Sequence, residues 1–489
     1  MLMTKPNIVF ILSDQHKADV MGCAGDEHVN TPNIDQLAEH GTMLENHYCN
    51  SPLCAPSRSS MLSGVLPAEN GVSNNMQSLR SDQATFAHSL SVAGYETVLS
   101  GRMHFVGPDQ RHGFEKRLVG DITPSFYGMD NEEQVYGSLK RTSNQNKIGI
   151  EKAGPGNSAV LDFDKDVTQA ACEHLENRED TRPLFMTVGL YGPHSPYICP
   201  EDLYHYYYEK LPIPEEITDE FRESVHPAIQ EWYNQRDLND ITVEQVRKVR
   251  AAYYGMVTHI DNLVGEVVNK VEETIGLENT IIIYGSDHGD NIGHHGLFWK
   301  TNFYEASVRA PLIFSWKDVI PEGQKIDGLT SLLDLAPTLI EVSGGPELPL
   351  MQGESLVPYL KNEQNIHENR VVISQLADIK GDKPSAMIRK GPYKLVLHYS
   401  YRHPQLFRLD TDPMEENDLA CLEEYSEVRE ELEKELLKHW DPEKAYHDLQ
   451  QSLSHFQIIK QWGQITNVEP VEEWIGDVKQ NYLLKESKE

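Results

Sequence analysis

Two continuous apolar runs, far apart in the chain, each stop abruptly at polar side chains. Residues 7–12 read Asn-Ile-Val-Phe-Ile-Leu, and residues 280–285 read Thr-Ile-Ile-Ile-Tyr-Gly. A run without polar alternation is typical of a strand buried on both faces of a parallel sheet. Runs at 97–100 and 184–190 have the same character, and an amphipathic stretch covers residues 246–270. Strands that alternate with helices predict an α/β fold, with a large mixed, mostly parallel sheet sandwiched by helices.

A second, smaller unit is expected after this sheet. At 489 residues the chain is long for a single core. The composition changes after residues 344–346 (Gly-Gly-Pro), and shorter apolar runs follow at 371–373 and 393–397, ahead of a helical pattern. We therefore expect a main domain over residues 1–365 and a small α+β subdomain with a helical tail over residues 366–489.

The charge of the chain limits its partners. A formal net charge of −33 argues against binding of nucleic acid and against anionic membrane surfaces. An anionic substrate would need a local positive pocket within this negative field. The charge itself is explained by solubility.

The cysteines and the N-terminal segment predict a cytoplasmic protein. The six cysteines show no spacing typical of a disulfide framework, so reduced thiols are the simpler interpretation. The first apolar run, residues 8–12, is too short for a signal peptide or a membrane span.

Acidic side chains follow two of the predicted strands, the first one in the chain and a late one. Asp14 and Gln15 come directly after the first strand, and Asp287 and His288 come directly after the late one. An aspartate at a strand end often caps the next helix. Two of them, each after a buried strand, favour a metal site instead, and oxygen ligands with one imidazole suit Ca²⁺, Mg²⁺ or Mn²⁺.

A short motif around Cys54 is the strongest candidate for a nucleophile. The segment 54–58 reads Cys-Ala-Pro-Ser-Arg and is followed by a Ser- and Gly-rich stretch. Pro56 sets a turn, so that Ser57 and Arg58 fall at the start of a helix, where backbone N–H groups and a guanidinium can hold an anion. Cys54 could be a buried small hydrophobe, a thiolate nucleophile or a modified residue.

The Cys-x-Pro-Ser-Arg motif resembles the signature of the type I sulfatases, which belong to the alkaline-phosphatase-like superfamily. The resemblance implies that Cys54 is oxidised to formylglycine by a maturation enzyme, and that the aldehyde hydrates to a gem-diol. It also implies one divalent cation, Ca²⁺ before Mn²⁺ or Mg²⁺, held by Asp14, Gln15, Asp287, His288 and residue 54. The Asp-Gln and Asp-His pairs are similar to those of the choline sulfatase and phosphonate monoester hydrolase branch.

Four more candidates follow strand ends in the order of that family: Arg102, His104, His194 and Lys300. The resemblance implies that Arg58, Arg102 and Lys300 neutralise the sulfate oxygens. His194 or Lys300 would protonate the leaving alcohol, and His104 would act as the base that helps to eliminate sulfate.

The substrate is less constrained than the reaction. Residues 103–115 resemble choline sulfatases most, but residues 121–133 lack the tryptophans that choline sulfatases carry there, and a quaternary ammonium group needs an aromatic cage. We expect a small sulfated carbohydrate, with choline sulfate, a phosphonate or phosphodiester, and a non-enzymatic anion- or metal-binding module as alternatives. The side chains predicted to contact substrate are His16, Asn75, Arg402 and His403.

The tail beyond Pro442 has apolar residues among charged ones, including Phe456, Ile458, Trp462 and Trp474. Such a tail predicts an arm that forms a homo-oligomer.

Overall fold

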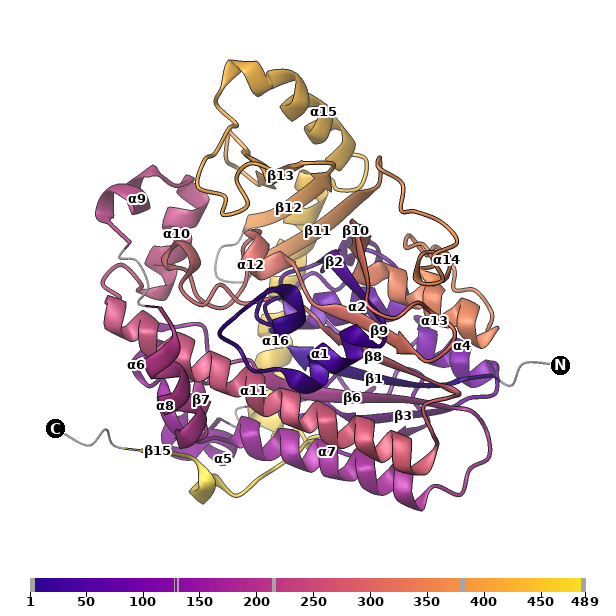
Figure 1. The fold of residues 1–489 in the computed structure, drawn as a ribbon. Helices are drawn as coiled ribbons and strands as arrows, with labels where there is room; N and C mark the ends of the chain where they lie inside the picture. The colour runs from indigo at the N-terminus through magenta and orange to yellow at the C-terminus, as the bar shows by residue number, and fades with distance from the viewer. Residues whose placement is uncertain (1–4, 127, 130–131, 213–216, 379–382, 485–489) are drawn as a thin grey trace.

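The computed structural model describes residues 5–126, 128–129, 132–212, 217–378 and 383–484. An eight-stranded sheet runs through the centre of the molecule, and helices cover both of its faces (Figure 1). The strands follow the order β10-β2-β9-β8-β1-β6-β3-β4. Their bounds are β1 Asn7–Asp14, β2 Thr42–Tyr48, β3 Glu96–Gly101, β4 Lys116–Arg117, β6 Leu184–Pro193, β8 Thr280–Ser286, β9 Leu312–Trp316 and β10 Gln324–Ser331.

The sheet is parallel except at β9, which runs antiparallel to its neighbours β2 and β8. β1 lies between β6 and β8 and is parallel to both. Ser13 pairs with Ser286, so the carboxyl ends of β1 and β8 lie side by side. The predicted fold class and the four predicted apolar strands are confirmed.

Two cores form because successive residues of β1 point to opposite faces of the sheet. Val9 and Ile11 belong to a core with α7 (Ala159–Asn177) and α11 (Val243–Thr274). Phe10 belongs to the opposite core. The helices of that second face are α2 Cys54–Ser63, α4 Phe86–Val92, α13 Leu335–Ser343 and α14 Val357–Leu360.

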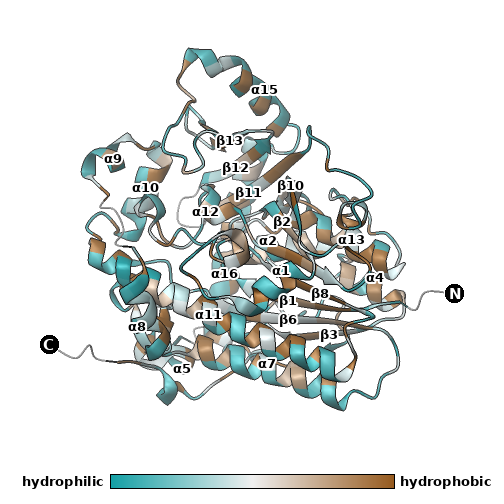
Figure 2. Cartoon of the chain, in the orientation of Figure 1, coloured by the Kyte–Doolittle hydropathy of each residue, from teal (hydrophilic) through white to brown (hydrophobic). Residues whose placement is uncertain are grey.

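The hydropathy of the layers follows this arrangement. The strands are mostly hydrophobic, and hydrophilic residues run along the outer sides of α7 and α11 (Figure 2). The other helices of the main domain are α1 Pro32–Glu39, α3 Pro67–Asn70, α5 Glu132–Tyr136, α6 Lys147–Glu151, α8 Glu201–Lys210, α9 Asp219–Ser224, α10 Pro227–Arg236 and α12 Glu305–Val308. Among the described residues, no helix combines the length and apolar character needed to cross a bilayer.

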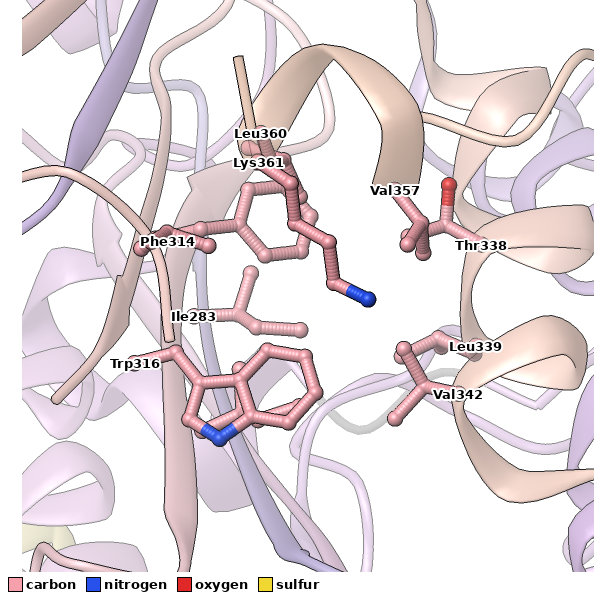
Figure 3. Close-up of a pocket in the computed structure, with 11 residues that line it drawn as sticks. Ile283, Phe314, Trp316, Thr338, Leu339, Val342, Val357, Leu360 and Lys361 are labelled. Atoms are coloured by element: carbon pink, nitrogen blue, oxygen red, sulfur yellow. The ribbon is translucent and has the colours of Figure 1, made fainter. Parts of the chain in front are cut away.

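A small gap remains in the packing between β8, β9 and the α13–α14 layer (Figure 3). Its walls are aliphatic and aromatic, including Ile283, Phe314, Trp316 and Leu339, and Lys361 is the one charged residue of the lining. Such walls offer little that would orient a polar ligand, so we interpret the gap as part of the core.

The C-terminal part contains a four-stranded antiparallel sheet with helices packed against it, which confirms its predicted α+β character. Its elements are β11 Val371–Asp378, β12 Lys383–Lys390, β13 Tyr393–His398, β14 Gln405–Arg408, α15 Ser426–Leu436 and α16 Pro442–Thr466. The chain then returns to the main domain, where β15 (Tyr482–Leu483) pairs with β5 (Gly154–Asn157), itself paired with β7 (Ile198–Cys199). The tail thus contacts both parts of the molecule, and the division at residue 365 stays a prediction.

Candidate active site

Four buried residues meet where β1 and β8 end, and we call them the strand-end group: Asp14, Cys54, Asp287 and His288. One potential ligand atom from each lies within 4.8 Å of all the others. The parallel register of β1 and β8 brings the two aspartates together, and α2 begins at Cys54. The Cys54 Sγ atom lies 3.5 Å from Asp14 Oδ1 and 3.2 Å from His288 Nε2. Two carboxylates and an imidazole fit a divalent cation, and an oxygen in place of Sγ would complete an oxygen-rich set.

Gln15 lies beside the strand-end group, but its side chain makes other contacts. Its backbone has φ 69° and donates from N to Asp287 Oδ1 at 3.1 Å. The side-chain amide donates to Asp290 Oδ2 at 2.5 Å, and its carbonyl oxygen accepts from Lys300. Asp290, which also accepts from the Tyr197 hydroxyl at 2.7 Å, was not foreseen from the sequence. A role of Gln15 as metal ligand stays a prediction.

Arg58 holds the two aspartates in place. Its Nε donates to Asp287 Oδ2 at 2.7 Å, and its Nη2 donates to Asp14 Oδ2 at 3.1 Å. Its Nη1 donates to the carbonyl oxygen of Arg102 at 3.0 Å. Burial alone would raise the pKa of Asp14, but the guanidinium groups of Arg102 and Arg58 hold it well below its usual range. Arg58 and the two aspartates are buried, so their hydrogen bonds are charge-assisted and shielded from water.

Arg102 lies on the other side of Asp14. Its Nε donates to Asp14 Oδ2 at 2.6 Å, and its guanidinium carbon lies 4.2 Å from the centre of the Tyr191 ring. Its Nη2 donates to His104 Nδ1 at 2.9 Å. Because a guanidinium can only donate, neutral His104 must carry its proton on Nε2 in this geometry. In this geometry His104 accepts a hydrogen bond at Nδ1 and has its N–H at Nε2.

Asp121, which the sequence did not indicate, contacts both Arg102 and the backbone of His104. Its carboxylate accepts from Arg102 Nη1 at 3.3 Å and from the backbone N of His104 at 2.8 Å. It also lies 3.7 Å from Arg117. Burial would raise the pKa of Asp121, but Arg102 and Arg117 lower it strongly, so the carboxylate stays ionised. It follows β4, which has only two residues, so no apolar run marks it in the sequence.

His194 and Lys300 form the remaining part of the predicted set. His194 Nδ1 donates to the carbonyl oxygen of Ser195 at 2.8 Å, which leaves Nε2 as the acceptor of the neutral ring. Burial lowers the pKa of His194 well below its usual value, and the Lys300 ammonium adds to this. The loop that carries His194 is anchored by Asp164, which accepts from the backbone N of Tyr191 at 2.6 Å. His194 is therefore neutral in this state.

The four predicted substrate contacts lie in different surroundings. Asn75 is next to the nucleophile, because its Oδ1 accepts from the backbone N of Ala55 at 3.0 Å. His16 lies in the interior, with its ring nitrogens at 2.6 Å from the Tyr284 hydroxyl and 2.9 Å from the Val20 carbonyl oxygen. Both ring nitrogens are occupied, so we do not carry this contact into the proposal below.

Arg402 and His403 are exposed on the loop between β13 and β14. They belong to the C-terminal part of the molecule and are not part of the strand-end group. Within the segment that lacks tryptophan, Tyr127, Asp130 and Asn131 lie outside the described residues.

Comparison with known proteins identifies the family of the chain. Residues 6–345 match the sulfatase family, and residues 293–441 match the family described as N-sulphoglucosamine sulphohydrolase, C-terminal. A choline-sulfatase of Rhizobium meliloti (strain 1021) is 34% identical over 429 residues, which cover 85% of this chain and 82% of that protein. An N-acetylglucosamine-6-O-sulfatase of Bacteroides thetaiotaomicron is 26% identical, with 88% and 85% covered.

The fold is also that of solved structures. The phosphonate monoester hydrolase of Agrobacterium radiobacter superimposes with a TM-score of 0.73 at 23% identity, covering 88% of this chain and 95% of that one. The chain belongs to the sulfatase family, within the alkaline-phosphatase-like superfamily, as its motif indicated, and it is a sulfatase.

Proposed function

We propose that this sulfatase releases inorganic sulfate from a small sulfated carbohydrate, with the aldehyde made from Cys54 as its nucleophile. The observation that carries the proposal is the position of the Cys54 Sγ atom, 3.5 Å from Asp14 Oδ1 and 3.2 Å from His288 Nε2. Oxidation of this thiol to formylglycine, followed by hydration, would put a hydroxyl oxygen in the place of Sγ. That oxygen would face the same carboxylate and imidazole.

In the first step the sulfuryl group moves to residue 54. One hydroxyl of the aldehyde hydrate gives its proton to Asp287 and attacks sulfur, and the bond from sulfur to the leaving oxygen breaks. The charge on the sulfate oxygens is compensated by Arg102 and Lys300. The leaving alcohol takes a proton, and we assign this proton to the Lys300 ammonium, because His194 is neutral in the structure.

In the second step sulfate leaves and the aldehyde is restored. The remaining hydroxyl of residue 54 loses its proton, its oxygen forms the C=O bond, and the bond from that carbon to the sulfate oxygen breaks. His104 is our candidate for the base. Its neutral ring can accept a proton only at Nδ1, which Arg102 contacts in the structure. The assignment therefore requires Arg102 to release His104 when substrate is bound.

The strand-end group would hold the divalent cation of the family, with Asp14, Asp287, His288 and residue 54 as ligands. We propose Ca²⁺, with Mn²⁺ and Mg²⁺ as alternatives. A cation bound there supplies positive charge beside the sulfate group.

The substrate class is a choice between three esters. The name of the Rhizobium relative supports choline sulfate, and that of the Bacteroides relative supports a sulfated amino sugar. We favour the carbohydrate because the sequence lacks the tryptophans expected for choline between residues 121 and 133. A phosphonate or phosphodiester remains the third choice. The nucleophile motif and the strand-end group are intact, so the non-enzymatic alternative is not retained.

A substrate panel tests this proposal. The protein is produced together with a formylglycine-generating enzyme, and peptide mass spectrometry measures the conversion of Cys54. Turnover of a sulfated monosaccharide, choline sulfate, an aryl sulfate and an aryl phosphonate is then compared. The proposal expects the highest kcat/KM on the sugar sulfate. Faster turnover of choline sulfate or of the phosphonate would overturn the substrate class or the reaction, respectively.

We also propose a cytoplasmic location and dependence on a maturation enzyme. All six cysteines are free thiols, as expected in a reducing compartment. Maturation must reach Cys54 before folding ends, because its side chain is 1% exposed in the folded chain.

Finally, we propose that α16 joins two copies of the chain. Ile458, Trp462 and Ile465 are exposed at 69%, 46% and 84% and follow a spacing of four and three residues, which puts them on one helical face. Two copies at net charge −33 repel each other, so a stripe with few charges is where they can meet. The double variant Ile458→Glu with Ile465→Glu should be monomeric in light scattering. A monomeric wild-type chain would refute the proposal.

A further inference from the structure

A cavity of about 60 Å³, open to solvent, lies where side chains of α10, of the segment after Lys300 and of the C-terminal sheet meet. We call it the leaving-group pocket, defined by Glu231, Trp232, Asn302, Lys383, His398 and Tyr401. None of these residues was singled out in the sequence.

The floor of the pocket is attached to the segment that carries the nucleophile. Thr301 lines the pocket, directly follows Lys300, and donates from its backbone N to the Pro52 carbonyl oxygen at 3.1 Å. Leu376 also lines the pocket. Its neighbours Gln375 and Ala377 donate from their backbone N atoms to the carbonyl oxygens of Asn50 and Ser73 at 2.9 and 3.1 Å. The pocket therefore borders the loop that leads to Cys54.

The charges inside the pocket are compensated. Glu231 Oε2 accepts from Lys383 Nζ at 2.8 Å and from the Tyr401 hydroxyl. His398 contacts Ser385 Oγ at 2.9 Å, and burial lowers its pKa to about 4, so the ring is neutral at pH 7. The lining as a whole offers hydrogen-bonding groups without a net charge.

The aromatic faces are unsuited to a cationic guest. The guanidinium carbon of Arg236 lies 4.1 Å from the centre of the Trp232 ring, and Lys383 Nζ lies 4.7 Å from that of Tyr401. A quaternary ammonium group would need such faces for itself and would meet these cations instead.

One polar group of the lining lacks a partner. Asn302 is 3% exposed, and its Nδ2 has no hydrogen-bond acceptor among the described residues. Its Oδ1 already accepts from the backbone N of Tyr304 at 3.2 Å, so the unsatisfied group is the donor. A buried donor without an acceptor is costly, and a ligand oxygen would satisfy it.

We propose that this pocket binds the uncharged, hydroxyl-bearing ring of the alcohol that leaves when the sulfate ester is cleaved. A sugar ring supplies hydroxyl oxygens for the Asn302 donor and hydroxyl groups for the Glu231 carboxylate. The inference rests on the proposed function and deepens it, because it assigns the specificity for carbohydrate to these residues.

The test compares two esters on the same variants. The matured enzyme is assayed with 4-methylumbelliferyl sulfate, which lacks a sugar ring, and with N-acetylglucosamine 6-sulfate, galactose 6-sulfate and glucose 6-sulfate. Tyr401→Phe and Asn302→Ala each remove one hydrogen-bonding group from the pocket. For the best sugar ester, each should lower the ratio of its kcat/KM to that of the aryl ester about tenfold.

Matched controls lie close by. Tyr399 on the same chain segment donates to Glu443 at 3.2 Å, as Tyr401 does to Glu231, but it does not line the pocket. Tyr399→Phe and the exposed Asn239→Ala should leave the ratio unchanged. The desulfated sugar alone should compete with the aryl ester, and this competition should weaken in the pocket variants.

The outcomes separate the two proposals. Absence of turnover on every ester by fully converted enzyme would overturn the proposed function. Turnover of the aryl ester without any sugar ester, or an unchanged ratio in both pocket variants, would overturn the pocket while the sulfatase reaction stands. If Asn302→Ala fails to fold, the kcat/KM ratio of Tyr401→Phe alone decides whether the pocket proposal stands.

Discussion

The strand-end group and the leaving-group pocket are two parts of one proposed substrate site, and they are built differently. Around the strand-end group, ionised side chains at 0–1% exposure bind one another, as Asp14 does with Arg58 and Arg102. In the pocket, Glu231 and Lys383 pair at 38% and 35% exposure, within reach of water.

This difference in burial determines how readily the ion pairs of each part can be rearranged. A buried carboxylate cannot lose its guanidinium partner without leaving a charge unpaired, which costs about 3–5 kcal/mol. A half-exposed pair can be rearranged at little cost, about 0–1 kcal/mol. The first arrangement suits a constant sulfate group, and the second suits an alcohol that varies between substrates.

The largest expected effect comes from Cys54. Cys54→Ala should lower kcat/KM on an aryl sulfate by on the order of 10⁴-fold or more, because no other group can form and release the sulfated intermediate. The melting temperature should change little. Cys421→Ala, at an exposed cysteine, is the control and should keep its activity. Turnover by Cys54→Ala near the wild-type rate would disprove the assignment.

Asp121→Asn should have the next largest effect. The change leaves Arg102 and Arg117 without their shared carboxylate, so we expect a loss of about 3 kcal/mol in the free energy of unfolding. Because Arg102 and His104 lose their alignment, kcat should fall about a hundredfold, with a smaller change in KM. Chemical unfolding and steady-state kinetics measure the two. A destabilised variant with normal kcat would show that Asp121 is only structural.

The sequence predicted the strand-end group for a physical reason. A buried parallel strand needs a continuous apolar run, so the ends of β1 and β8 are visible as the places where apolar residues stop. Side chains at such ends meet on one edge of the sheet, as Asp14 and Asp287 do. The proline and the small residues predicted a helix here, but it begins at Cys54 and not at Ser57, so Pro56 lies in its first turn.

The pocket and Asp121 could not be predicted in this way. The pocket combines α10, the segment after Lys300 and three strands of the C-terminal sheet, and no spacing in the chain relates them. Asp121 contacts Arg102 and His104, which precede the two-residue strand β4, and Arg117, which belongs to it. Their positions follow from tertiary packing, which leaves no periodic pattern in the sequence.

A smaller effect is expected at the C-terminal tail, which supports Asp121 from outside. The backbone carbonyl oxygen of Glu472 accepts from the backbone N of Asp121 at 3.0 Å, and the backbone N of Trp474 donates to the Asp121 carbonyl oxygen at 2.8 Å. Glu473 Oε1 accepts from the backbone N of Ser125 at 2.6 Å. Glu473→Ala should therefore lower kcat a few-fold and the free energy of unfolding by about 1–2 kcal/mol.

The control for the tail is Glu469→Ala, at an exposed position four residues earlier. It removes the same charge without touching the Asp121 loop, so kcat and stability should stay at the wild-type values. Equal kinetics for the two variants would contradict a link between the tail and the active site.

The last prediction concerns the pH dependence of stability, which should differ between the two parts. Burial holds the pKa of His398, in the pocket, at about 4, below the 6.5 of an unfolded histidine. The unfolded chain therefore binds a proton that the folded chain does not, and stability falls as the pH drops from 6.5 to 4. Asp14 has a lowered pKa, so its contribution to stability is present above pH 3.8 and does not change in this window.

His398→Asn should make the fall in stability shallower by about 1.4 kcal/mol per pH unit, measured by urea unfolding between pH 6 and 4.5. Other buried histidines such as His47 and His259 add to the total slope in both proteins, so only the difference between them reports on His398. Parallel curves for the variant and the wild type would mean that His398 titrates in the folded pocket as it does in water, and the neutral lining inferred for a sugar ring would then fail below pH 6.5.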